Sequence, residues 1–203
     1  MARFRFERDR LQFLASRILL RHTLGAATRQ SPGSLRFSTD AHGEKPRLIT
    51  PERTESPAPP LHFSLTHTSL LVACALTRSG DVGLDAEAWS RPMRVDALAP
   101  RVLSPREAQA LASMPAEARP RRFLEHWTMK EAWLKATGTG LRVSPSSVEV
   151  DADCDPRWRV RLVEACPDHA MALVWPRLDA TGRVPDAYVR AFELPPPPDA
   201  AAG

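Results

Sequence analysis

The order in which helical and strand-like segments follow one another is the feature that most limits the fold of this chain. One helix-like segment near the start precedes a group of β-rich runs, and two further helix-like segments precede a second group of β-rich runs. The first group comprises residues 61–66, 70–77 and 81–87, and the second comprises 147–150, 157–164, 170–175 and 187–193. A doubly wound parallel sheet would alternate strands and helices instead. The order therefore predicts an α+β fold.

Local signals place the helices more closely. Apolar residues recur at helical spacing at Leu11, Leu14, Ala15 and Ile18, which predicts one amphipathic helix that stops at Gly25.

A second helix should begin at Ser104, because Ser104, Pro105 and Glu107 form a capping-box pattern. A third begins at Pro120 and ends at Gly138. The proline-rich residues 43–60 read as a surface loop.

Length and composition restrict the class of protein. With 203 residues and 22.5 kDa the chain suits one domain or two small joined lobes. Hydrophobic residues make up 43% and charged residues 26%, as in globular proteins. The apolar runs are far shorter than the ~20 residues of a membrane-spanning helix. The N-terminus has no apolar segment typical of a secretory signal. We therefore expect a cytoplasmic protein that does not enter a membrane.

The charge of the chain indicates the kind of partner to expect, and the spacing of its cysteines indicates their role. A formal charge of +4 and a pI near 9.4 favour a polyanionic partner, and a nucleic acid is one alternative. Cys74, Cys154 and Cys166 show no C-x-x-C spacing, so reduced thiols in packing roles are expected.

Only three of the 28 basic residues are lysines, namely Lys45, Lys130 and Lys135. Because arginine serves almost everywhere else, each retained lysine raises the question whether an ammonium group is required there.

Two carboxylates at the end of the third β-rich run are the first candidate site. On a strand, Asp85 and Glu87 would point to the same face and Ala86 to the other. Such a pair of hard oxygen ligands suits Mg²⁺, which completes its coordination with waters and substrate phosphate. The alternative is a solvated strand end that pairs with arginines.

The helix that begins at Pro120 carries the second candidate. Trp127, Glu131 and Lys135 are four residues apart and share a face. Glu131 could serve as a metal ligand or general base, and Lys135 as a charge at a leaving phosphate. The alternative is a surface ion pair beside core tryptophans.

A hydroxyl-rich strand end forms the third candidate. Ser64, Thr66 and His67 could offer hydroxyls and an imidazole to an anion, although a histidine in such a turn is also a common structural hydrogen bonder. Arg8 and Lys45 are candidate phosphate contacts or solvated charges. The sequence contains no P-loop, dinucleotide, α/β-hydrolase or zincin motif.

Taken in order, five segments resemble motifs of the Sfp-type 4′-phosphopantetheinyl transferases. The family pattern is a G-x-P-like segment, F-N-I-S-H-S, G-I-D-I-E, W-x-x-K-E-x-x-x-K and G-x-G-L. The segments here are GEKP, FSLTHT, GLDAE, WTMKEAWLK and GTGL, and the resemblance covers residues 6–150. Ser64 and Thr66 replace Asn and Ser, and Glu44 separates Gly43 from Lys45. Each motif alone is modest, whereas the ordered set is specific.

The resemblance implies an activity and an architecture. The activity is transfer of the phosphopantetheine arm of coenzyme A to a serine of an acyl or peptidyl carrier protein, with release of 3′,5′-ADP. The architecture is a pseudo-dimer of two similar α+β lobes with the active site at their junction. We expect the lobes at residues 1–82 and 83–194, followed by a proline-rich disordered tail at 195–203.

The resemblance also implies roles for individual residues. Asp85, Glu87 and Glu131 would hold Mg²⁺, with Mn²⁺ as the alternative ion, against the pyrophosphate of the co-substrate coenzyme A. The implied catalytic residues are Asp85, Glu131 as base for the carrier serine, and Lys135 as the charge that neutralises the departing phosphate. The implied contacts to the nucleotide are Arg8, Lys45, Ser64, Thr66, His67 and Lys135.

The implied partner is a carrier protein, and its usual acidity would suit a basic enzyme acting as a monomer. Two alternatives stay open at this point. One is a basic nucleic-acid-binding protein, and the other is a catalytically inactive binder of coenzyme A or of a carrier protein.

Overall fold

The computed structural model describes residues 7–39, 46–49, 60–68, 70–150, 155–178, 182–183 and 188–193. Within these residues helices and strands occur in the predicted order, which confirms the α+β fold class. The segment 147–150, expected as a strand, instead begins with the last residue of the short 3-10 helix η3 (Pro145–Ser147), and residues 148–150 are not part of a sheet. No helix in this described part of the chain has the length and apolar character that a membrane span needs.

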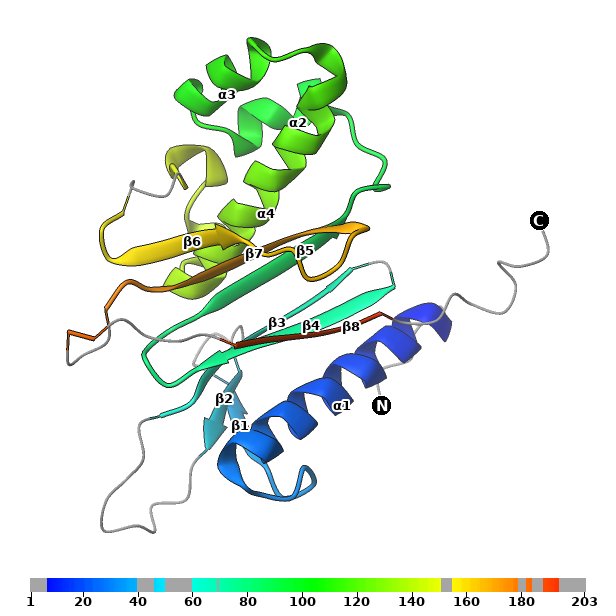
Figure 1. Ribbon diagram of the computed structural model, residues 1–203, viewed down its shortest axis with the longest axis vertical. Coiled ribbons are helices and arrows are strands. Elements are labelled where there is room, and N and C mark those ends of the chain that lie inside the picture. Colours follow the sequence, from blue (N-terminus) through cyan, green and yellow to red (C-terminus); the bar gives the residue numbers. More distant parts are fainter. Residues whose placement is uncertain are drawn as a thin grey trace.

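Two three-stranded antiparallel sheets form the centre of the molecule (Figure 1). The first has the order β3-β4-β8, from β3 (His62–Thr68), β4 (Leu71–Thr77) and β8 (Tyr188–Glu193). The second has the order β5-β7-β6, from β5 (Gly83–Ala88), β7 (His169–Pro176) and β6 (Trp158–Leu162). Since β8 belongs to the expected second lobe but pairs with β4, segments of both expected lobes build the first sheet. The division at residue 82 stays a prediction.

One long helix packs against each sheet. The helix α1 (Glu7–Thr28) lies on β3 and β4, and α4 (Arg119–Thr137) lies on β5 and β7. In Figure 1 the two helices stand on opposite sides of the molecule, with the sheets between them. The strands β3 and β5 contact each other, so the two sheets meet where the candidate residues lie.

The buried face of α1 differs from the expected one. Leu11, Leu14 and Ile18 are 52%, 42% and 58% exposed. The helix instead buries a second stripe that includes Leu20 and Leu24, which pack with residues of β3 and β4. The segment carries two apolar stripes, and only contact with the sheet decides between them.

The end of α1 also differs from the prediction. The helix continues through Gly25 to Thr28, and Arg29 adopts a left-handed conformation with φ of 54°. The amide of Gln30 donates to the carbonyl of Gly25 over 3.0 Å. A Cβ at Gly25 would lie 2.8 Å from the Gln30 carbonyl oxygen, so this glycine allows the return of the chain rather than stopping the helix.

A small hairpin precedes the first sheet. β1 (Arg36–Thr39) pairs with β2 (Pro46–Ile49), so part of the segment expected to be a loop is a strand. A proline at the first position of a short edge strand is compatible with this pairing.

Three helical segments lie between β5 and α4. α2 (Val95–Val102) was not predicted, and it contains Pro100. α3 (Pro105–Ala112) has the predicted capping box at Ser104 and Glu107, and the turn η1 (Ala116–Ala118) leads into α4. α4 ends at Gly138, whose φ of 64° confirms the predicted stop.

The close packing of α4 on β5 depends on Gly83. A Cβ at this position would lie 1.8 Å from the carbonyl oxygen of Ala132, so no larger residue fits without separating the two elements. This approach brings side chains of α4 to the end of β5. Cys74 and Cys166 are buried in the core, as expected, and burial raises the pKa of the Cys74 thiol to about 12. Cys154 lies outside the described residues.

Candidate active site

The two carboxylates of β5 project to one face of the strand, as predicted. Asp85 and Glu87 face β3, where Thr66 donates to Oδ1 of Asp85 over 3.2 Å and Thr68 to Oε2 of Glu87 over 3.5 Å. Ala86 turns the other way into the hydrophobic core. Alternation along the strand therefore presents both carboxylates at the meeting line of the two sheets.

Asp85 is buried and bound to Lys135. The ammonium of Lys135 donates to Oδ1 of Asp85 over 2.7 Å and to the carbonyl oxygen of Leu84 over 3.1 Å. Oδ2 of Asp85 is buried with no hydrogen-bond partner among the described residues. Burial raises the pKa of the Asp85 carboxyl, and the positive charge of Lys135 opposes that rise. Oδ2 of Asp85 is therefore a candidate ligand for a cation.

Glu87 is held by a cation from its own strand end. Arg91 donates from Nη1 to Oε1 of Glu87, and its guanidinium stacks 5.1 Å from the ring centre of Trp127. Burial raises the pKa of Glu87, whereas the charge of Arg91 lowers it. The alternative of a strand end that pairs with an arginine therefore applies to Glu87, while Asp85 pairs with a lysine.

Glu131 comes to the same place from α4. It is half-buried, and in the described part of the chain it makes no hydrogen bond or ion pair. Burial raises the pKa of Glu131, the negative charge of Asp85 raises it further, and Lys135 lowers it. Glu87 also contributes, so the three carboxylates are close enough to repel one another.

The donor set fits Mg²⁺ chemically. Three carboxylates face the two cations Lys135 and Arg91, which leaves an excess of negative charge. All the donors are hard oxygens, and one of them, Oδ2 of Asp85, is buried without a partner within the described residues. No three His, Cys, Asp or Glu side chains of this described part are yet gathered at metal-binding distances. The metal ligands therefore stay a prediction.

A cavity of about 660 Å³ adjoins Lys135, although none of the three carboxylates is among its described lining residues. It lies between α1, the hairpin strand β2, β3 and the end of α4, and Lys135 lines it. Two further predicted residues, Ser64 and His67, also line it. Lys135 therefore belongs both to the cavity and to the carboxylate cluster.

The cavity is basic. Arg17, Arg47 and Arg142 line it together with Lys135, and Asp81 is the one acidic side chain among its described lining residues. Sequence reasoning missed the three arginines, because in a chain so rich in arginine no local motif distinguishes them. A concave surface with several cations suits a ligand with more than one phosphate.

The hydroxyls of β3 serve partly to join the sheets. Ser64 accepts a hydrogen bond from the amide of Leu84 over 3.0 Å, and Thr66 bonds Asp85 as described above. Both side chains are buried. His67 is exposed at the cavity, and Arg8 is exposed in the first turn of α1 but does not line the cavity. Lys45 lies outside the described residues.

Lys130 has a different role from Lys135. It is 1% exposed and bonds Oε2 of Glu107 over 2.5 Å, together with the carbonyl oxygens of Pro145 and Val148. Three acceptors converge on one ammonium group, which explains a lysine here without any catalytic role.

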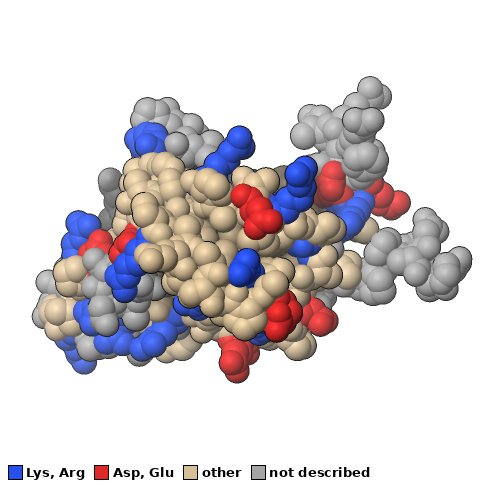
Figure 2. All heavy atoms as spheres, turned by 90° about the horizontal axis from the view of Figure 1, so that it is seen from above, with Lys and Arg blue, Asp and Glu red and all other residues tan. Residues whose placement is uncertain are grey.

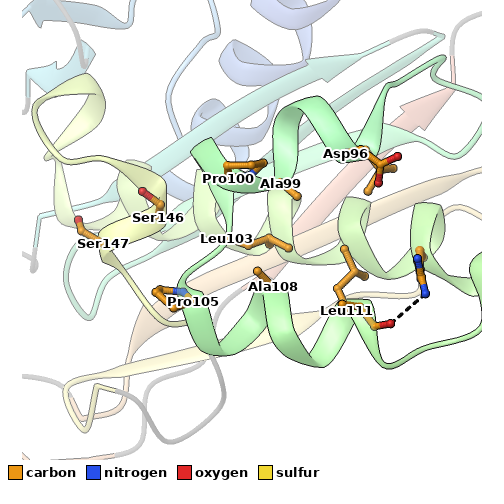
Figure 3. Close-up of a pocket in the computed structure, with 12 residues that line it drawn as sticks. Asp96, Ala99, Pro100, Leu103, Pro105, Ala108, Leu111, Ser146 and Ser147 are labelled. Atoms are coloured by element: carbon orange, nitrogen blue, oxygen red, sulfur yellow. Dashed lines mark hydrogen bonds between the residues drawn. The ribbon is translucent and has the colours of Figure 1, made fainter.

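A second hollow, of about 620 Å³, lies away from these residues (Figure 3). It runs between α2, α3 and η3, with Leu103, Ala108 and Leu111 along it and Asp96 at its edge. On the face seen in Figure 2, uncharged residues occupy the centre and charged residues lie mostly around them. None of the sequence-predicted site residues lines this hollow.

Comparison with known proteins gives the family. Residues 81–176 match the family model of the 4′-phosphopantetheinyl transferase superfamily. The 4′-phosphopantetheinyl transferase HetI of Nostoc sp. is 37% identical over 139 residues, which are 68% of this chain and 56% of that protein. The 4′-phosphopantetheinyl transferase psf-1 of Bacillus pumilus is 33% identical over 167 residues, which are 82% of this chain and 65% of that protein.

Among solved structures, a holo-(acyl-carrier-protein) synthase from Bacillus anthracis in complex with CoA (3′,5′-ADP) matches with a TM-score of 0.39 and 24% identity. The match covers 46% of this chain and 92% of that one. The chain spans between about half and two thirds of the length of the curated relatives named above. On the match to the family model and these relatives, the chain belongs to the 4′-phosphopantetheinyl transferase superfamily.

Proposed function

We propose that this protein transfers the 4′-phosphopantetheine arm of coenzyme A to a serine of an acyl or peptidyl carrier protein in the cytoplasm. The serine oxygen forms a bond to the phosphorus that bears the pantetheine. The bond from that phosphorus to the bridging pyrophosphate oxygen breaks, and 3′,5′-ADP leaves. The observation that carries the proposal is the position of Lys135, which lines a basic cavity and bonds Asp85 of a carboxylate cluster.

The cavity supplies the binding part of this proposal. The nucleotide end of coenzyme A carries a 3′-phosphate and a pyrophosphate, and arginines bind such groups with charge-assisted hydrogen bonds. Arg17, Arg47 and Arg142 are the cations available for them. His67 at the same wall offers an imidazole to the ligand. This arrangement would hold the pyrophosphate near Lys135 and the carboxylates.

The carboxylates and Lys135 supply the chemical part. Glu131 would accept the proton of the carrier serine, and its raised pKa makes it a stronger base than an exposed glutamate. Lys135 would place its charge at the departing phosphate, and Asp85 orients that ammonium over 2.7 Å. Mg²⁺, held by Asp85, Glu87 and Glu131, would supply charge neutralisation at the pyrophosphate.

The test uses a fluorescent coenzyme A conjugate, a purified apo carrier protein and the full chain. We expect the carrier serine to be labelled with Mg²⁺ present and not with EDTA. The variant Asp85→Ala should not label, whereas Asp155→Ala should label normally, because Asp155 only pairs with the exposed Arg157. Absence of labelling with fatty-acid, polyketide and peptide carriers, from folded protein, would contradict the proposal.

The same variants separate the two alternatives. A nucleic-acid-binding protein would shift a labelled oligonucleotide in a salt-dependent manner, and Asp85→Ala would not weaken that shift. An inactive binder would take up coenzyme A in calorimetry but release no 3′,5′-ADP when a carrier is present.

A further inference from the structure

Arg91 occupies the carboxylate cluster although no motif includes it. It follows β5 by three residues, where its amide donates to the carbonyl of Ala88 over 3.0 Å and closes a turn. Its guanidinium lies between Oε1 of Glu87 and the ring of Trp127 on α4. The turn therefore places the positive charge of Arg91 beside the carboxylate of Glu87 on β5.

Glu87 is engaged at both oxygens of its carboxylate. Arg91 donates from Nη1 to Oε1. Thr68 engages the other oxygen of Glu87 over 3.5 Å. Both oxygens of Glu87 thus have partners, whereas Oδ2 of Asp85 has none among the described residues.

We propose that Arg91 is the internal counter-ion of the carboxylate site, and that a divalent cation binds there only by displacing its guanidinium from Glu87. This inference rests on the proposed function, which assigns a divalent cation to these carboxylates. Arg91 is 40% exposed at its side chain, so it can leave Glu87 without being buried elsewhere. The stacking contact with Trp127 lets the displaced side chain stay nearby.

Competition between Arg91 and a divalent ion predicts the direction in which an Arg91 variant changes the affinity for the ion. Removing the charge of Arg91 frees an oxygen of Glu87 and removes repulsion toward a divalent ion, so affinity for the ion should rise. A partly exposed ion pair is worth about 1 kcal/mol at most, which corresponds to a gain of roughly fivefold. A purely structural arginine would give no gain.

The experiment measures binding of Mn²⁺ to the full chain by the loss of free Mn²⁺ signal in electron paramagnetic resonance, without coenzyme A. We expect Arg91→Gln to bind Mn²⁺ about fivefold more tightly than the unmodified chain. Arg91→Lys, which keeps the charge, should stay near the unmodified chain. Glu87→Gln should weaken binding.

Arg121 provides a matched control. It pairs with Glu125 at the same i,i+4 spacing over 3.6 Å and stacks 4.1 Å from the ring centre of Trp89, but on the α4 surface. Arg121→Gln should leave Mn²⁺ affinity unchanged. If Arg91→Gln binds Mn²⁺ with unchanged or lower affinity while Arg121→Gln is unchanged, the counter-ion role is wrong.

A second measurement uses no variant of Arg91. Displacement of its guanidinium should change the emission of Trp127, so Mg²⁺ titration should alter the fluorescence of the unmodified chain and not that of Trp127→Phe. An equal change in both proteins would overturn the proposal. If the fluorescence change is equal in the two proteins but carrier labelling depends on Mg²⁺, the counter-ion role of Arg91 is wrong and the proposed function stands. If carrier labelling persists in EDTA, a metal takes no part in the proposed function, and the counter-ion role of Arg91 fails with it.

Discussion

Two lysines of α4 hold carboxylates in opposite ways. Lys130 and Glu107 form a closed pair, with side chains 1% and 3% exposed, that joins α4 to α3 and to the segment 145–148. Lys135 and Asp85 form an open pair, with side chains 34% and 10% exposed, beside a basic cavity and two more carboxylates. The two lysines are five residues apart on one helix.

The difference lies in charge balance and in access. In the closed pair Oε2 of Glu107 also accepts from the amide of Ser104 over 2.7 Å, so the pair completes the capping of α3. Around the open pair three acids, Asp85, Glu87 and Glu131, face the two bases Lys135 and Arg91, and burial raises the pKa values of the acids. Loss of one partner of an enclosed pair leaves a buried charge without compensation, whereas acids with raised pKa values beside a cavity mark a candidate ligand site.

Breaking the closed pair should have the largest effect on stability. Lys130→Met leaves Glu107 buried without its cation, and we expect a loss of about 3–5 kcal/mol in the free energy of unfolding. Urea unfolding followed by circular dichroism measures it. The double variant Lys130→Met, Glu107→Gln should recover part of the loss, because no isolated charge remains. A single variant as stable as the unmodified chain would show that the pair is not needed.

Breaking the open pair should remove activity instead. Asp85→Ala should lower carrier labelling by on the order of 10²- to 10³-fold, as for loss of a group that positions charge in a transition state. Stability should change by less than about 1 kcal/mol, because the loss of contacts to Lys135 and Thr66 is offset by relief of repulsion with Glu131. An unfolded Asp85→Ala protein would count against a ligand site here.

The features of the two pairs that depend on neighbouring residues could be predicted from the sequence. Alternation on a strand predicted the shared face of Asp85 and Glu87, and the pattern from Ser104 to Glu107 predicted the cap. Both depend on residues within four positions of each other. The start of α4 near Pro120 and its end at Gly138 were readable for the same reason.

The rest depends on contacts between distant segments. The partner of Lys130 is set by the packing of α3 and η3 on α4. The arginines of the cavity come from α1, from β2 and from the short 3-10 helix η2 (Gly140–Arg142). The face that α1 buries is decided by β3 and β4. No pattern confined to a few neighbouring residues determines such contacts, so local sequence reasoning missed them.

Replacing one arginine of the cavity should have a smaller effect, on the affinity for the nucleotide. Arg47→Ala should raise the dissociation constant for 3′,5′-ADP about three- to tenfold, because one charge-assisted contact to phosphate is lost at an exposed position. Calorimetry at low and high salt measures it, and the difference should shrink as salt rises. Arg36→Ala on the neighbouring strand β1 is the control, since Arg36 does not line the cavity. Equal effects of both variants would contradict a specific phosphate contact.

The smallest expected effect comes from replacing a glutamate with glutamine, once beside the open pair and once in the closed pair. Folding raises the pKa of Glu131, so folded protein keeps that proton to higher pH, and the resulting stability is lost as pH rises through the raised pKa. Glu131→Gln should therefore raise the Tm at pH 8 in EDTA, on the order of 2 °C, and the gain should vanish near pH 4. Glu107→Gln should lower the Tm at pH 8, because Lys130 loses its counter-charge. Thermal scans at both pH values measure the two signs. A lower Tm for Glu131→Gln at pH 8 would show that the charge of Glu131 is compensated in the folded protein, and the contrast between the open and the closed pair would then fail.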